Sequence, residues 1–329
     1  MKDGGAVMNR KARIVITDCD HGTIEAEERV AAQAGADISL ANCVTEDDVI
    51  RAAAGADGVI VQYAPVTAAV LDALPDLRVI SRYGVGVDTI DVGAAAARGV
   101  LVCNVPDYGT EDVSDHAIAL AVALLRGIPA LDRGLRQGTA DLDPVKPLHR
   151  FRGRTFGIVG LGRIGVGTGR KARALGFEVV AHDPVVETVP EELRGAELLS
   201  LDELLRRADV VSLHVPLIDE TRNLINVGTL ASMKPEAIIV NTCRGGVVDT
   251  EALADALERG QILGAALDVT EPEPLPPSHR LYQLPNVVIT PHAGWYSEES
   301  FTELKERAAG NAIDGALGKT PRDVVAAGQ

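Results

Sequence analysis

Three polar residues in the second half of the sequence have side chains suited to the reversible reduction of a carbonyl group. Arg244 and His292 stand at or just past the carboxyl ends of apolar stretches, and Glu273 stands in the loop after another. A guanidinium can bind a carboxylate through two parallel N–H groups and can polarise a carbonyl. Histidine can give a proton to that carbonyl oxygen or take it back, and a carboxylate partner favours its protonated form. We interpret the three residues as a catalytic set for interconverting a 2-oxo acid and a 2-hydroxy acid.

A glycine-rich turn at residues 160–165, of the form G-x-G-x-x-G, lies between the apolar stretch 155–159 and a helical pattern. Asp183 closes the next apolar stretch, 18 residues after Gly165. This order is typical of a dinucleotide site, where glycines admit the pyrophosphate to a helix N-terminus and the acid binds the ribose 2′-hydroxyl. Asp183 would repel a 2′-phosphate, and Pro184 supplies no cation, so NAD is favoured over NADP. The turn residues assigned to the cofactor are Gly160, Gly162, Arg163, Ile164 and Gly165.

Each of these residues also has a structural interpretation. Residues 160–165 could form a plain strand–helix turn, with Asp183 capping a helix. The three candidate catalytic residues could be, in chain order, a surface ion-pair residue, a solvated loop acid and a turn residue. The functional interpretation is stronger because all of them fall on one expected edge of a sheet, the edge where ligands bind in open α/β folds.

Short apolar stretches alternate with Ala-rich amphipathic stretches along the chain. The strands and helices that they predict must position these side chains. Runs rich in Val and Ile, separated by helical patterns, predict parallel strands buried on both faces. Five such runs end near Val105, and six more follow from Arg154, predicting two α/β layers, the second a complete doubly wound sheet. Residues 110–138 form one long helical pattern, interpreted as a connector helix. The helical stretch 297–317 could return to the first layer, which would make that domain discontinuous.

Composition excludes several classes of function. The 329 residues favour two domains, and the net charge of -15 argues against binding nucleic acid or an anionic membrane surface. Four separated cysteines without a C-x-x-C pair, and no clustered ligands, predict neither a disulfide framework nor a metal site. Residues 1–13 lack the apolar core of a secretory signal, and no apolar run reaches about 18 residues. A soluble protein of the reducing cytoplasm is expected.

The chain resembles the NAD-dependent D-2-hydroxyacid dehydrogenases over nearly its whole length. The motifs that carry the resemblance are SRYGVGVDTIDV, VGLGRIG, SLHVPL, NTCRGGVVDTEAL, GAALDV followed by EPEP, and TPHAGW. VPDYGTEDVSDHAIAL and TPHAGWYSEES are most similar to the branch that includes the C-terminal-binding proteins and their bacterial relatives. The resemblance implies a flavodoxin-like substrate-binding domain, residues 1–105 plus 294–329, and a Rossmann NAD-binding domain, residues 106–293. It places the active-site cleft between them.

The resemblance also implies roles for single residues. Arg244 binds the substrate carboxylate, Glu273 pairs with His292, and His292 donates and accepts the proton. Asp268 is similar to the acid that binds the nicotinamide carboxamide. The remaining cofactor positions line the adenine pocket, at His214 and Pro216, or the nicotinamide side, at Thr242 and Cys243.

Further positions concern the substrate. The backbone around Val85 and Gly86 resembles the loop that holds the substrate carboxylate. Trp295 resembles a tryptophan that faces the active site, so Trp295 and Tyr63 are expected to form an apolar wall. Arg82 is a candidate for a second cationic contact with the substrate. Its alternative interpretation is a surface residue at the end of a strand. The loop at residues 62–65 lacks the basic residue that phosphoglycerate-binding relatives tend to have, which favours an uncharged substrate side chain.

Two positions depart from the family pattern. Cys243 replaces the usual Ala, and we interpret it as a passive small residue rather than a reactive thiol. Thr270 stands where an aromatic residue is frequent. The apolar face of residues 116–125 is interpreted as a dimer or domain-packing surface, and a homodimer is expected.

Three functions remain open from the sequence. The first is an NAD-dependent oxidoreductase acting on a small 2-oxo acid or D-2-hydroxy acid. The second is an NAD-sensing dimeric scaffold resembling the C-terminal-binding proteins. The third is a dehydrogenase of a phosphorylated or phosphonate 2-hydroxy acid. The complete set of Arg244, Glu273 and His292 favours the first.

Overall fold

The computed structural model describes residues 10–325, which form two compact units. The first unit comprises residues 10–108 and 297–325, and the second comprises residues 109–296. The predicted boundaries, after residues 105 and 293, each lie three residues earlier in the chain than the structural ones. The prediction about a secretory signal concerns residues 1–13, most of which lie outside the described residues.

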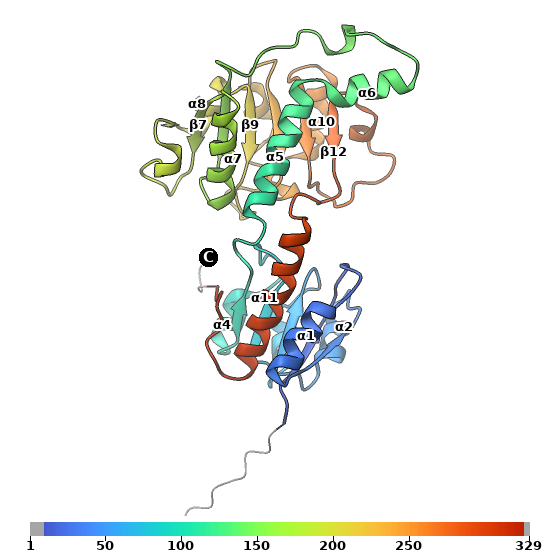
Figure 1. Cartoon of the computed structure of the whole chain (residues 1–329), viewed down its shortest axis with the longest axis vertical. Helices are drawn as coiled ribbons and strands as arrows, with labels where there is room; N and C mark the ends of the chain where they lie inside the picture. Colours follow the sequence, from blue (N-terminus) through green and yellow to red (C-terminus); the bar gives the residue numbers. More distant parts are fainter. Residues whose placement is uncertain (1–9, 326–329) are drawn as a thin grey trace, which may run out of the picture. The chain divides into compact units, whose positions relative to one another are not determined.

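The first unit is built on a five-stranded parallel sheet with the order β2-β1-β3-β4-β5, which is the flavodoxin-like order. Helix α11 packs beside α1 (Figure 1). Residues of α2, α3 and α4 contribute to an apolar core of this unit. Helices on both faces explain why the strands read as continuous apolar runs. The strands are β1 (Arg13–Ile16), β2 (Asp37–Leu40), β3 (Gly58–Val61), β4 (Val79–Arg82) and β5 (Leu101–Cys103). The helices are α1 (Glu25–Ala34), α2 (Glu46–Ala53), α3 (Ala68–Ala73), α4 (Val92–Ala97) and α11 (Glu298–Ala316).

The second unit is a doubly wound parallel sheet with the order β12-β11-β10-β9-β6-β7-β8. Helices α5 and α7 pack side by side (Figure 1). They contribute to one apolar core, and α8, α9 and α10 contribute to the other. The strands are β6 (Thr155–Val159), β7 (Glu178–His182), β8 (Glu197–Leu198), β9 (Val210–Leu213), β10 (Ile238–Asn241), β11 (Gly264–Leu267) and β12 (Val287–Ile289). The helices are α5 (Thr110–Leu125), α6 (Ile128–Arg136), α7 (Arg163–Ala174), α8 (Leu201–Arg207), α9 (Val227–Ala231) and α10 (Thr250–Glu258).

Two details of the second unit differ from the sequence prediction. Six strands were expected, but a seventh, β8, pairs with β7 at the sheet edge. Its two residues are too few to show a periodicity. The helical pattern 110–138 is two helices rather than one, because Gly127 adopts a left-handed conformation with φ +63°. Pro129 in the first turn of α6 then lacks the N–H that a continuous helix would need.

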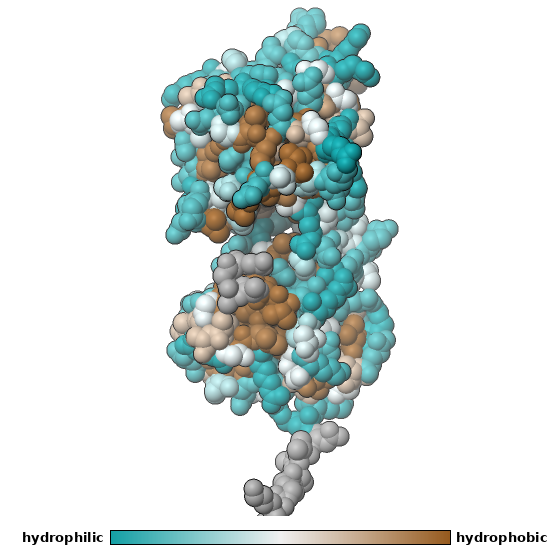
Figure 2. Space-filling model, turned by 90° about the vertical axis from the view of Figure 1, so that its left-hand side faces the viewer, coloured by the Kyte–Doolittle hydropathy of each residue, from teal (hydrophilic) through white to brown (hydrophobic). Residues whose placement is uncertain are grey.

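The surface is mainly polar around these cores. On the face drawn in Figure 2, hydrophobic residues form separate patches within a largely hydrophilic surface. Among residues 10–325, no helix combines the length and the apolar character needed to cross a bilayer.

A buried ion pair attaches the returning helix α11 to the first unit. The side chains of Lys305 and Glu27 are 1% and 0% exposed, and Nζ lies 3.0 Å from Oε1. The Tyr83 hydroxyl donates to the same carboxylate oxygen at 2.5 Å, and Lys305 also donates to the Thr23 carbonyl. Burial and the charge of Glu27 raise the pKa of Tyr83, so its hydroxyl remains a donor. Breaking such a pair leaves one charge buried without compensation.

We expect Lys305→Met to lower the free energy of unfolding by about 3–5 kcal/mol, because the Glu27 charge stays buried. Hydrogen exchange of α11 peptides, followed across urea concentrations, measures the effect within the first unit. Arg29→Met is the matched control, since the Arg29–Glu306 pair joins the same two helices at 3.1 Å but is exposed. Its loss should cost no more than about 1 kcal/mol. Equal effects of the two changes would contradict the prediction.

Candidate active site

The glycine turn between β6 and α7 uses its glycines for two different purposes. Gly160 has φ +99°, and a Cβ there would lie 2.5 Å from the His214 carbonyl oxygen. A Cβ at Gly165 would lie 2.0 Å from the Gly160 carbonyl oxygen. Gly160 therefore lets the turn pack on the segment after β9, and Gly165 lets α7 approach the turn closely. A Cβ at Gly162 would meet nothing within 4 Å, so the space in front of the helix is open at that position.

The N-terminus of α7 fits a bound pyrophosphate. Gly162 is the residue before the helix, and no side chain caps the first turn. Its free N–H groups and the helix dipole suit an anion. Gly162 and Arg163 are exposed and Ile164 is partly exposed, as residues lining such a site should be.

Asp183 is fixed at the carboxyl end of β7. One carboxylate oxygen accepts from the Leu161 N–H at 2.8 Å, and the other accepts from the Val185 and Val186 N–H groups at 2.9 and 3.2 Å. A carboxylate has about four acceptor positions, so it retains capacity for a ribose hydroxyl. Asp183 thus connects the glycine turn to the end of β7, where the ribose would bind.

The other predicted cofactor positions follow β9 and β10. His214 Nε2 lies 2.8 Å from the Ser212 hydroxyl, and burial lowers the pKa of His214 to about 3, so the ring is neutral. Pro216 is exposed. Thr242 is 9% exposed, and its buried hydroxyl lacks a hydrogen-bond partner, which fits a polar cofactor group at this position. Burial raises the pKa of Cys243 to about 11, so its thiol stays protonated, consistent with a passive residue.

The loop that carries Arg244 packs tightly on the loop after β11. A Cβ at Gly245 would lie 2.1 Å from the Thr270 carbonyl, and one at Gly246 would lie 2.4 Å from the Glu271 carboxylate. The Asn241 side chain donates to the Arg244 carbonyl at 2.9 Å. Gly245 meets backbone atoms and is therefore needed to bring Arg244 and the segment leading to Glu273 to one edge, whereas the Glu271 side chain beside Gly246 can move.

Glu273 and His292 form the expected pair. Nδ1 of His292 lies 2.6 Å from Oε1 of Glu273, with the side chains 28% and 40% exposed. His292 has φ +54°, an uncommon conformation for a residue other than glycine, and its N–H donates to the Asp268 carbonyl at 2.8 Å. The carboxylate fixes the orientation of the ring and leaves Nε2 as the atom available to another molecule.

Asp268 holds the turn that contains His292. Its carboxylate accepts from the Thr290 hydroxyl at 2.6 Å and from the N–H groups of Ala293 and Gly294, both at 2.9 Å. Burial raises the pKa of Asp268, but hydrogen bonds from His116, Thr290 and the two N–H groups outweigh burial and hold it below its ordinary value. The structure therefore gives the predicted cofactor residue a second contact, with the His292 turn.

The predicted substrate residues divide between the two units. Tyr63 follows β3, whereas Arg82 ends β4 and precedes Val85 and Gly86, so these four share the carboxyl edge of the first sheet. Tyr63 and Val85 are 52% and 42% exposed. Trp295 belongs to the second unit, where its ring packs edge-on against Tyr296.

Sequence reasoning missed two residues beside the site. Nε2 of His116, which the sequence analysis does not assign to the site, lies 3.0 Å from the Thr290 hydroxyl. Thr290 follows the last residue of β12, so the rule that polar residues at strand ends meet at one edge would have found it. His116 gave no local signal, since its partner is 174 positions away.

A Rossmann sheet with this glycine turn, strand-end acid and histidine–carboxylate pair defines an NAD-dependent dehydrogenase. The family model described as D-isomer specific 2-hydroxyacid dehydrogenase, NAD binding domain, matches residues 118–294, more than half of the chain. The chain belongs to this family. The predicted family, fold class, NAD cofactor and enzyme class are thereby confirmed. The similarity to the C-terminal-binding-protein branch stays a prediction.

Individual relatives support this assignment. A glyoxylate reductase of Korarchaeum cryptofilum is 42% identical over 264 residues, which cover 79% of this chain and 80% of the relative. A D-3-phosphoglycerate dehydrogenase of Mycobacterium tuberculosis is 45% identical over 263 residues, covering 80% of this chain but 49% of the relative, so the chain spans about half of that protein. An NAD-complexed D-isomer specific 2-hydroxyacid dehydrogenase of Lactobacillus delbrueckii has a TM-score of 0.78 and 28% identity, over 96% of this chain and 100% of that chain.

We expect Asp183→Asn to weaken NADH binding by about 10-fold, because a charge-assisted hydrogen bond to the ribose is lost. Asparagine still offers a carbonyl oxygen to the Leu161 N–H, so the turn should persist. The preference for NADH over NADPH should fall at the same time, since the repulsive charge is gone. Fluorescence titration with both cofactors measures the two affinities, and an unchanged ratio would contradict the role of Asp183.

Proposed function

We propose that the protein reduces a small 2-oxo acid with an uncharged side chain to the D-2-hydroxy acid, or catalyses the reverse reaction. The carrying observation is the Glu273–His292 pair, with Nδ1 and Oε1 2.6 Å apart. Arg244, Glu273 and His292 follow β10, β11 and β12, which are neighbours in the sheet that carries the dinucleotide turn. This arrangement supports one reaction centre at the carboxyl edge.

Arg244 binds and orients the substrate in this proposal. Its guanidinium accommodates a carboxylate with two parallel hydrogen bonds and stabilises the negative charge that develops on the carbonyl oxygen. The N–H groups around Val85 and Gly86 are the proposed second holder of the carboxylate. Bound NADH supplies the hydride.

His292 holds the proton that the substrate oxygen receives. Nδ1–H donates to Glu273, so Nε2 is the atom that exchanges the proton. The imidazolium gives its proton to the substrate oxygen during reduction, and the imidazole that remains can take the proton back in the reverse direction. The left-handed turn at His292, held by Asp268, keeps the ring at this position.

Support for an uncharged substrate side chain comes from the loop after β3. The Tyr63 and Ala64 N–H groups donate to one oxygen of Asp18 at 2.6 and 3.1 Å, and the Gln62 N–H donates to the other at 3.1 Å. Successive N–H groups of this kind can bind a phosphate, but here they are taken by a carboxylate. Residues 62–65 also contain no cation. A phosphate or phosphonate group bound by this loop would meet the negative charge of Asp18.

One of the two relatives is named for a small 2-oxo acid. Glyoxylate, named for the Korarchaeum cryptofilum relative, has no side chain, whereas the mycobacterial relative is named for a phosphorylated substrate. The loop that Asp18 occupies favours the first type for this chain.

Four cysteines, all unpaired, support a reducing compartment such as the cytoplasm.

A homodimer is part of the proposal and is supported by an uncovered apolar face on the second unit. Ile128, Leu131 and Leu135 share one side of α6, yet the helix has no buried residue. Ile128, Leu135 and Leu142 are 52%, 66% and 58% exposed. Ile128, Leu131 and Leu135 form what we call the α6 face, and Leu142 is a further exposed apolar side chain in the segment after the helix. A second copy of the chain is the proposed occupant, because an isologous contact covers the same face on both partners.

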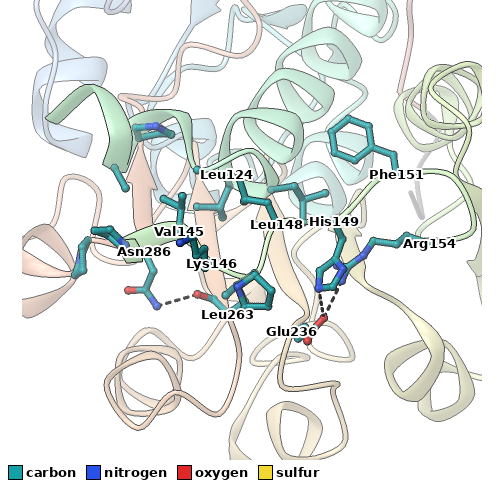
Figure 3. A pocket seen from close by; sticks show the side chains of 17 residues that line it. Leu124, Val145, Lys146, Leu148, His149, Phe151, Arg154, Glu236, Leu263 and Asn286 are labelled. Atoms are coloured by element: carbon teal, nitrogen blue, oxygen red, sulfur yellow. Dashed lines mark hydrogen bonds and ion pairs between the residues drawn. The ribbon is translucent and has the colours of Figure 1, made fainter. Parts of the chain in front are cut away.

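A cavity of about 200 Å³ lies next to this face, lined by α5, α6, residues 144–149 and Phe151 (Figure 3). Leu124, Val145 and Leu148 line it, and His149 and Arg154 both point to Glu236 at 3.4 and 2.7 Å. Its strand-side residues precede β6, β10, β11 and β12, so the cavity lies at the amino edge of the sheet, opposite the catalytic set. We assign it to the proposed dimer surface and not to the substrate.

We expect His292→Gln to lower kcat by about 10²- to 10⁴-fold, because the proton donor is lost. NADH affinity should be retained. The measurement is NADH oxidation against glyoxylate, pyruvate, hydroxypyruvate, branched 2-oxo acids, phosphonopyruvate and phosphohydroxypyruvate, with unphosphorylated acids preferred. His279→Gln, in a histidine that pairs with Glu251, is the control and should change kcat by less than about twofold.

Retention of full turnover by His292→Gln would contradict the proposed mechanism. A preference for the phosphorylated substrates would contradict the role given to Asp18. If the unaltered protein binds NADH tightly but turns over no 2-oxo acid, the NAD-sensing scaffold becomes the better interpretation.

We expect the double variant Ile128→Glu/Leu135→Glu to sediment as a monomer while still binding NADH, because the charges would be buried in the dimer contact. Sedimentation velocity measures the change. Leu175→Glu is the matched control, since Leu175 is 43% exposed at the end of α7, outside the α6 face. An unaltered protein that is already monomeric would refute the dimer.

A further inference from the structure

A histidine of helix α5 contacts the turn that carries His292. Nε2 of His116 lies 3.0 Å from the Thr290 hydroxyl and 3.4 Å from Oδ1 of Asp268. Thr290 in turn lies 2.6 Å from the same carboxylate oxygen. All three residues belong to the second unit. The family motifs assign this contact to none of them.

The direction of each hydrogen bond follows from the chemistry of the groups. Asp268 is ionised and can only accept, so the Thr290 hydroxyl must donate its proton to Asp268. The hydroxyl oxygen can then only accept from His116, which requires a proton on Nε2 of that ring. The result is a chain of donors, from His116 Nε2–H to the Thr290 hydroxyl to the Asp268 carboxylate.

The same three groups fix the conformation of the turn. Asp268 also accepts from the Ala293 and Gly294 N–H groups, and its carbonyl accepts the His292 N–H at 2.8 Å. A Cβ at Gly294 would lie 2.9 Å from the Asp268 carboxylate and 3.2 Å from the His116 ring, so the ring and the turn are in close contact. A non-glycine residue with positive φ, such as His292, persists only where its surroundings impose that conformation.

We propose that His116, acting through Thr290 and Asp268, is a positioning residue that holds His292 in its left-handed turn and so aims its ring at the substrate. His116 touches neither the substrate nor the pair of His292 with Glu273. The proposal depends on the proposed role of His292 only for its kinetic consequence. The conformational consequence can be measured independently of turnover.

The kinetic test uses two matched pairs of variants. His116→Phe keeps the ring volume but removes the donor, whereas His116→Gln can place an N–H group near the former Nε2 position. Thr290→Val removes the hydroxyl of the chain, and Thr290→Ser keeps it. We expect His116→Phe and Thr290→Val each to lower kcat by about 10- to 100-fold through misplacement of His292. KM for the 2-oxo acid should change by less than about threefold, and His116→Gln and Thr290→Ser should recover most of kcat.

A double variant distinguishes a hydrogen-bonded chain through Thr290 from two independent contacts. If His116 acts only through Thr290, His116→Phe/Thr290→Val should lose no more activity than either single variant. Multiplied losses, or equal losses in His116→Phe and His116→Gln with both proteins folded and binding NADH, would overturn the proposal, as would full kcat in His116→Phe.

Nuclear magnetic resonance of the imidazole protons gives the second readout. The Nδ1–H proton of His292, hydrogen-bonded to Glu273, should give a resolved resonance in the unaltered protein and in His116→Gln, and a broadened or shifted one in His116→Phe. An unchanged resonance in His116→Phe would overturn the proposal. If the unaltered protein shows no turnover but the resonance depends on His116, the proposed function fails while the positioning role stands.

Discussion

A buried carboxylate must collect enough hydrogen bonds to stay charged, and the geometry of the second unit's site depends on how Asp268 does so. Asp268 is 3% exposed. Its donors come from two directions, the turn after β12 and helix α5. Satisfying one charge thereby determines the path of the backbone from Thr290 to Gly294. His292 lies in this segment. The hydrogen bonds that keep Asp268 charged therefore also hold His292 in its left-handed conformation.

The two parallel sheets use their strand edges in contrasting ways. In the first sheet, the order changes between β1 and β3, and there Asp18 takes the N–H groups of residues 62–64. In the second sheet, the order changes between β6 and β9, and there Gly162 and the uncapped start of α7 leave the N–H groups open. Both crevices are places where α/β folds bind ligands. In this chain an internal acid fills one of them and a cofactor suits the other.

Much of this arrangement could be predicted because it follows from local pattern. Buried parallel strands read as continuous apolar runs, which located the strands except for β8, whose two residues at the edge carry no pattern. The pairing of Glu273 with His292 was predictable because polar residues at neighbouring strand ends must meet. The break at Gly127 was not, since a helical pattern continues on both sides and the left-handed glycine packs on Val145, which follows later in the chain. His116 was missed for the same reason, as its meaning depends on a contact with a distant residue.

The return of α11 has a consequence for the order in which the chain folds during synthesis. The second unit is complete once Tyr296 has been made, whereas the first unit waits for residues 297 onward. Until Lys305 arrives, Glu27 has no counter-charge, and the face of the first sheet that α11 covers stays open to water. Synthesis therefore completes the sequence of the second unit before that of the first, although the first unit begins the chain. During that interval a chaperone has a defined apolar face of the nascent chain to bind.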